Sequence, residues 1–167
     1  MRRPVEMPAR AEENVLGGTV GRVLGLDLGT VRIGVAVSDS EGRLAVAREV
    51  ISRGASRKED FARVAALVEE TGATRVVVGL PVSLDGSSGP AARKVEREVT
   101  EMRASLAVPV LLFDERLSSV EAARRRREAR SEGRRGSRGR IGSRDLPVDA
   151  AAAAIVLQAY LDSAKGA

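Results

Sequence analysis

Hydrophobic runs near the start of the chain predict three consecutive β-strands. Val23–Leu28 and Ile33–Val37 are apolar runs on either side of Gly29-Thr-Val-Arg32, a pattern that is typical of a β-hairpin. Gly29 supplies the backbone freedom that such a turn needs. A third run, Leu44–Ile51, follows a short polar turn. Because the connections are short, the three strands are expected to form an antiparallel meander.

Two later runs are short and wholly apolar. The first lies within Arg75–Leu80 and consists of the residues after the arginine. The second is Val108–Phe113. A strand that is apolar on both faces is typical of a sheet covered on both sides, in which neighbouring strands run parallel. These two runs are therefore predicted to extend the meander into a mixed sheet.

Helical spacing of apolar residues predicts helices between and after these strands. The first ends at Gly72, a residue suited to a helix C-cap, and the second begins at Pro90, whose fixed φ suits a first helical position. A capping box at 118–121 starts another. The four predicted helices are Lys58–Glu70, Pro90 to about Leu106, Ser119 to about Ala129, and Val148 to about Ala164. The order βββαβαβαα predicts an α/β fold with a mixed five-stranded sheet flanked by helices.

The composition narrows the class of protein. The 167 residues suit one domain, predicted at 21–165, whose core must be aliphatic because only 2% of residues are aromatic. The absence of cysteine excludes disulfides and thiolate metal sites and fits a cytoplasmic location. No apolar run approaches the roughly 20 residues of a membrane span. Residues 1–20 mix Arg, Pro and Glu without a signal-peptide core, and we expect a disordered leader there.

The positive charge of the chain is concentrated in one segment. Residues 124–144 hold ten arginines and two glutamates, a local charge of +8, so the remainder carries −3 of the net +5. A basic segment on a mildly acidic domain favours a polyanionic partner such as nucleic acid. The alternative is a solvated loop, and an Arg/Gly-rich flexible insert is predicted at about 131–146 in either case.

Three acids occupy positions where an acid is structurally costly or unexpected. Asp27 lies inside the first apolar strand, Glu115 follows the last strand, and Asp149 lies on the apolar face of the last helix. In a chain without histidine or cysteine, a hard cation held by oxygen ligands would compensate them. If they converge, they could bind one or two Mg²⁺ or Mn²⁺ ions and support phosphodiester cleavage.

Each acid could also have a purely structural role, an interpretation that is weakest for Asp27. Asp149 could simply interact with the helix dipole, and Glu115 could be a solvated strand end. Asp114 should point to the side of the strand opposite Glu115 and ranks below it as a ligand, although a bend in the chain there could bring it in. Asp39 and Asp85 are predicted to be turn residues.

Four sequence blocks, taken in order, resemble the YqgF family of RuvX-like Holliday junction resolvases, whose members are also described as pre-16S rRNA nucleases. The resemblance spans roughly residues 22–162 and implies an RNase H-like fold, with Asp27, Glu115 and Asp149 as the catalytic set. The lead into Val148-Asp149 is longer and richer in Arg and Gly than is usual for the family. The blocks are Gly25–Asp39; Val78–Pro81 with Asp85-Gly86 and Gly89-Pro90; Asp114–Ser119; and Val148-Asp149 with Ile155–Gln158.

These features predict a metal-dependent endonuclease acting on structured nucleic acid, with processing of the 5′ end of precursor 16S rRNA as the first choice. Alternatives are a Holliday junction resolvase acting on branched DNA, and a non-catalytic nucleic-acid-binding factor. The segment 25–30 also resembles the phosphate-binding hairpin of actin-like kinases, but no residues remain for their second lobe. The oligomeric state, monomer or homodimer, stays open.

Binding to the nucleic acid is expected to be electrostatic and sensitive to salt, because aromatic side chains for base stacking are scarce. The residues expected to contact phosphate lie at the hairpin turn, after the last strand and in the basic segment. They are Thr30, Arg32, Arg116, Arg134, Arg135, Arg138, Arg140 and Arg144.

Overall fold

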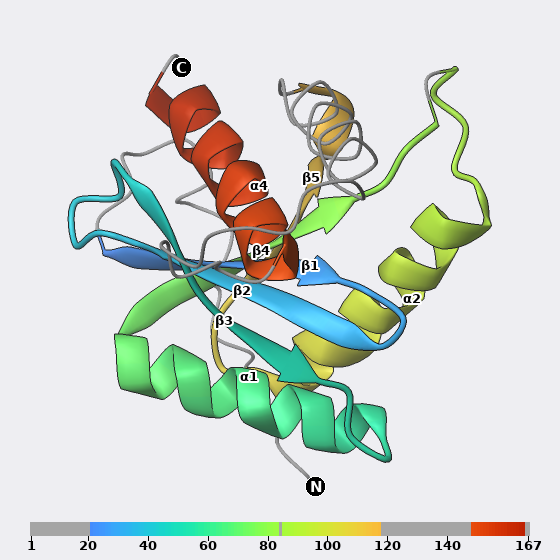
Figure 1. The fold of residues 1–167 in the computed structure, drawn as a ribbon, viewed down its shortest axis with the longest axis horizontal. Helices are drawn as coiled ribbons and strands as arrows, with labels where there is room; N and C mark the ends of the chain where they lie inside the picture. Colours follow the sequence, from blue (N-terminus) through green and yellow to red (C-terminus); the bar gives the residue numbers. More distant parts are fainter. Residues whose placement is uncertain (1–20, 84, 118–147, 166–167) are drawn as a thin grey trace, which may run out of the picture.

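In a computed structural model, residues 21–83, 85–117 and 148–165 are described. The predicted leader, the predicted helix at 119–129 and the basic segment lie outside these residues. The described elements follow the predicted order. They are β1 Arg22–Leu28, β2 Arg32–Ser38, β3 Ala45–Ser52, α1 Arg57–Thr71, β4 Ala73–Leu80, α2 Pro90–Ser105, β5 Val110–Asp114, the 3₁₀ turn η1 Glu115–Leu117, and α4 Val148–Lys165 (Figure 1).

The five strands form one mixed sheet in the order β3-β2-β1-β4-β5. β1, β2 and β3 pair antiparallel, whereas β4 pairs parallel to β1 and β5 pairs parallel to β4. This arrangement confirms the predicted meander with two added parallel strands. β1 therefore lies at the centre of the sheet, and its carboxyl end is flanked by strands on both sides.

Helices cover both faces of this sheet, α4 on one and α1 with α2 on the other (Figure 1). Along β1 the side chains alternate between the two cores. Leu24 and Leu26 belong to the core beneath α1 and α2, and Val23 belongs to the core beneath α4. Gly25 also faces α4, because a Cβ built there would lie 2.7 Å from Leu157 Cβ.

Local signals set most element boundaries. The Ser56 side chain accepts a hydrogen bond from the Glu59 amide and caps α1, and Gly72 ends this helix in the left-handed region at φ 67°. Pro90 begins α2, as predicted. The third strand begins at Ala45, one residue later than predicted. Leu44 belongs to the preceding turn, where its carbonyl accepts a hydrogen bond from Asp39 N at 2.9 Å.

Candidate active site

Asp27 lies at the carboxyl end of the central strand, on the face covered by α4. It is two residues beyond Gly25 and therefore shares its face of the sheet. The sequence pattern predicts an acid within a buried strand, but Asp27 is only partly buried, because β1 ends one residue later at the exposed turn. An ionised carboxylate at this position keeps some contact with solvent.

Glycines flank Asp27 on both neighbouring strands. Gly34 of β2 is its direct antiparallel partner. On the other side, Leu26 pairs with Val78 of β4, so Gly79 is the next residue along β4, beside Asp27. Because neither glycine has a side chain, there is space on both sides of Asp27 on the face of the sheet covered by α4. Other chain segments can approach the aspartate through this space.

The start of α4 occupies the space over Gly34. A Cβ built on Gly34 would lie 1.9 Å from the Asp149 carbonyl oxygen and 3.0 Å from Ala150 N. The backbone of Asp149 thus packs directly on the strand that pairs with Asp27. The sequence analysis placed Asp149 on the apolar face of the last helix, and in the structure its side chain is 34% exposed. The Asp149 side chain reaches Arg32, whose Nε is 2.9 Å from Asp149 Oδ2.

Glu115 approaches Asp27 from the opposite side. It is the first residue of η1, directly after β5. A Cβ built on Gly79 would lie 2.7 Å from Glu115 Oε1 and 3.1 Å from a methyl group of Val156 on α4. The Glu115 carboxylate therefore lies on the α4 face, over the glycine beside Asp27.

The three predicted acids thus lie at one end and on one face of the sheet, contributed by β1, η1 and α4. Within the described ranges, however, no three acidic side chains come close enough together to form a metal site. The Asp149 carboxylate is held by Arg32 instead. The metal-ligand roles of Asp27, Glu115 and Asp149 accordingly remain predictions. Their carboxylate oxygens are the type of donor that Mg²⁺ and Mn²⁺ bind.

Of the predicted phosphate contacts, Thr30 and Arg32 are exposed at the β1–β2 turn, where the Arg32 side chain is 61% exposed. Arg116 is held by its neighbour, because Asp114 accepts hydrogen bonds from the Arg116 backbone N at 2.9 Å and from Nη2 at 2.7 Å. This contact lowers the pKa of Asp114, which is thus engaged by an arginine. The five predicted contacts in the basic segment lie outside the described residues.

The two acids predicted to be turn residues do have that role. Asp39 Oδ1 accepts hydrogen bonds from the backbone N of Arg43 at 2.6 Å and of Leu44 at 3.3 Å. Asp85 Oδ1 accepts from the backbone N and the hydroxyl of Ser87 at 2.9 and 2.7 Å. These contacts lower the pKa of both carboxyl groups.

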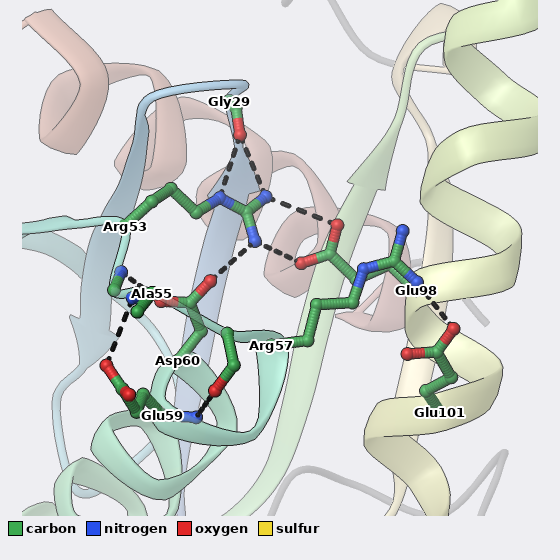
Figure 2. Close-up of polar contacts among 10 residues, drawn as sticks. Gly29, Arg53, Ala55, Arg57, Glu59, Asp60, Glu98 and Glu101 are labelled. Atoms are coloured by element: carbon green, nitrogen blue, oxygen red, sulfur yellow. Dashed lines mark hydrogen bonds and ion pairs between the residues drawn. The ribbon is translucent and has the colours of Figure 1, made fainter.

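Sequence reasoning missed Arg53, which follows β3 and contacts the turn beyond Asp27. Its guanidinium donates to the Gly29 carbonyl from Nε at 3.1 Å and from Nη2 at 2.8 Å (Figure 2). It also pairs with Asp60 of α1 and Glu98 of α2, both buried. The signal for Arg53 is that each of two helices carries a buried acid that needs a cationic partner. This signal is visible only when the burial of the two acids is known from the structure.

Comparisons with known proteins identify the relatives of this chain. Residues 21–163 match the family model described as "RuvX: Holliday junction resolvase". Among curated relatives, the "Putative pre-16S rRNA nuclease" of Anaeromyxobacter dehalogenans (strain 2CP-C) is 48% identical over 142 residues, covering 84% of this chain and 96% of the relative. The protein with the same description from Thermoanaerobacter pseudethanolicus is 38% identical over 144 residues, covering 86% and 98%.

A solved structure shares the fold. Thermus thermophilus RuvC, in complex with Holliday junction substrate, aligns with a TM-score of 0.51 over 87% of this chain and 96% of that chain, at 22% identity. In the described residues of our chain, no helix has the length and apolarity needed to cross a bilayer. The extent of the family match and the identity to its curated relatives lead to one conclusion: the chain belongs to the RuvX family of Holliday junction resolvases, a family of nucleases with an RNase H-like fold.

Proposed function

We propose that this protein is a metal-dependent endonuclease that hydrolyses phosphodiester bonds in structured nucleic acid, and that its substrate is the 5′ end of precursor 16S rRNA. One observation carries the proposal: Asp27 lies between two glycines over which Asp149 and Glu115 approach it. The substrate follows from the description shared by curated relatives.

The donor set fits a hard divalent cation. We assign Asp27, Glu115 and Asp149 as the residues that would hold Mg²⁺ or Mn²⁺. When bound, such an ion supplies an activated water and stabilises the leaving oxygen in phosphodiester cleavage. Arg32 contacts Asp149 and is well exposed. A substrate phosphate would therefore compete with the Asp149 carboxylate for the Arg32 guanidinium.

The remaining residues bind and orient the substrate. Thr30 and Arg32 at the exposed turn are suited to contact the phosphate backbone close to Asp27. The basic segment at 124–144 adds charge for a polyanion. Binding of this kind positions the backbone without reading the sequence of bases, which suits an enzyme that recognises the shape of a folded RNA.

The direct test is Asp27→Asn, which removes the charge and keeps the size of the side chain. Purified protein should cleave a precursor 16S RNA fragment in Mg²⁺ or Mn²⁺, and Asp27→Asn should abolish cleavage without changing the circular dichroism spectrum. Asp162→Asn is the matched control, because Asp162 is an exposed acid near the opposite end of α4. Wild-type cleavage by Asp27→Asn would disprove the assignment of the site.

A second candidate is cleavage of branched DNA, favoured by the description of the family model. A four-way DNA junction assayed beside the precursor RNA separates the two substrates. Cleavage of the junction alone would replace the RNA assignment and retain the nuclease chemistry. If wild-type protein binds either substrate and cleaves neither, the protein is a non-catalytic binding factor.

A further inference from the structure

A buried ion cluster lies next to the candidate site, on the side of the sheet covered by α1 and α2. It consists of Arg53, directly after β3, Asp60 of α1 and Glu98 of α2 (Figure 2). The Arg53 side chain is 15% exposed, and the Asp60 and Glu98 side chains are 4% and 2% exposed. Taking such charges out of water is costly unless they are paired and hydrogen-bonded.

All five N–H groups of the Arg53 guanidinium have acceptors. Nη1 donates to Asp60 Oδ2 at 3.0 Å and to Glu98 Oε1. Nη2 donates to Glu98 Oε2 at 3.2 Å, and both Nη2 and Nε donate to the carbonyl oxygen of Gly29. Arginine offers five donors in a fixed planar fork, so the site matches its full capacity. Lysine, with three donors on one atom, cannot reproduce this pattern.

The two acids hold the guanidinium in a defined orientation. The second oxygen of Asp60 accepts a hydrogen bond from the backbone N of Gly54 at 2.8 Å, which fixes the carboxylate itself. Burial lowers the pKa of Arg53, but hydrogen bonds to Glu98 and Asp60 outweigh it and raise this pKa above its ordinary value. The side of Arg53 that faces the turn is therefore a permanently charged and rigid donor.

Arg53 contacts the turn 29–32 through its backbone as well. Its amide N donates to the Val31 carbonyl at 2.9 Å, and within the turn Gly29 N donates to the Arg32 carbonyl at 2.9 Å. Arg53 thus binds two of the four carbonyls of this turn. The same turn displays Thr30 and Arg32 to solvent and directly follows the strand that carries Asp27.

Stability alone does not account for this arrangement, because a buried ion pair is often no more stabilising than well-packed apolar residues. We infer that Arg53 is a positioning residue, which fixes the turn 29–32 so that Thr30 and Arg32 meet the substrate backbone at a set distance from Asp27. The anchoring of the turn stands by itself, whereas its effect on substrate rests on the proposed function.

The test compares Arg53→Lys with Arg57→Gln. Arg57 is the matched control, because it pairs with Glu101 and so links α1 to α2 without a contact to the turn. Hydrogen exchange at the amides of Gly29 and residue 53 reports the turn. KM and kcat for the precursor RNA, or for the four-way junction if that is the molecule cleaved, report the substrate.

We expect Arg53→Lys to speed exchange at both amides by about tenfold or more, the factor equivalent to one charge-assisted hydrogen bond. KM should rise several-fold with a smaller change in kcat, and Arg57→Gln should leave all four quantities unchanged. Glu98→Gln, which keeps the volume and one acceptor, should act in the same direction and replaces Arg53→Lys if that variant does not fold.

Three results would overturn the inference. They are wild-type exchange at Gly29 in Arg53→Lys, equal loosening of the turn by Arg57→Gln, and a loosened turn with unchanged KM. If the wild-type protein cleaves neither nucleic acid, the proposed function fails, and the Kd for the labelled RNA replaces KM. Unchanged exchange would then still reject the anchoring, independently of any nuclease activity.

Discussion

Replacing Gly34 by alanine places one methyl group between β2 and the start of α4. The new Cβ would lie 1.9 Å from the Asp149 carbonyl oxygen and 2.4 Å from its carbonyl carbon. Both atoms are backbone, so no side-chain rotation relieves the contact. Because a Cβ atom essentially never lies within 3.0 Å of a non-bonded heavy atom, the gap must widen by at least the difference of 3.0 and 1.9, which is 1.1 Å.

This displacement affects stability and activity to different degrees. Overpacking of a well-packed contact costs about 1–3 kcal/mol of the free energy of unfolding, which lowers Tm by about 2–4 °C per kcal/mol in a domain of this size. A misplacement of about 1 Å in a catalytic constellation costs about 100-fold in rate. Gly34→Ala should therefore fold and remain largely inactive, because the first turn of α4 carries Asp149.

The assay measures kcat on the precursor RNA and Tm by circular dichroism. Gly72→Ala is the control: this residue ends α1 at φ 67°, and a Cβ there meets no atom within 4 Å. A non-glycine residue in the left-handed region costs about 1–2 kcal/mol. The control thus loses a comparable amount of stability through backbone strain, far from the site, and should keep its kcat.

Wild-type kcat in Gly34→Ala would contradict this prediction. It would show that activity tolerates a displacement of the first turn of α4, which carries Asp149. A loss of kcat in both variants in proportion to Tm would instead assign the effect to stability. Only a loss confined to Gly34→Ala supports the close approach of α4 as a requirement of the site.

Three further outcomes are expected. Gly79→Ala should lower kcat with a smaller loss of Tm than Gly34→Ala, because its new methyl group meets the end of the flexible Glu115 side chain; equal rates for Gly79→Ala and wild type would reject Glu115 as a site residue. Arg32→Gln should reduce the slope of log Kd against log salt for the precursor RNA by about 1 if Arg32 contacts one phosphate. The hydrogen bonds from Arg116 hold the pKa of Asp114 below its ordinary value of 3.8. The stabilisation from these hydrogen bonds is thus fully present above the ordinary pKa and is lost as the pH falls through the lower pKa of the folded state. The Tm difference between wild type and Asp114→Asn should therefore vanish in acid.

Local sequence patterns predicted the order and type of the five described strands and three described α-helices, but not the 3₁₀ turn η1. Apolar runs marked the five strands, and Gly72 and Pro90 marked a helix end and a helix start, because these signals act over a few residues. The same reading singled out Asp27, because an acid in an apolar run stands out locally. It placed the boundaries less well where tertiary pairing decides them, as at Ala73, which joins β4 beside Arg22.

The surroundings of Asp27 depend on contacts between distant parts of the chain. Gly34 gains its importance from a register that sets it opposite Asp27 and from a helix, more than 100 residues later, that packs on it. Arg53 gains its importance from acceptors on the turn, α1 and α2 together. Such sites arise from contacts between elements distant in sequence, and no local pattern encodes the distance between them. The acids could therefore be named from the sequence, whereas the glycines and the arginine that position them could not.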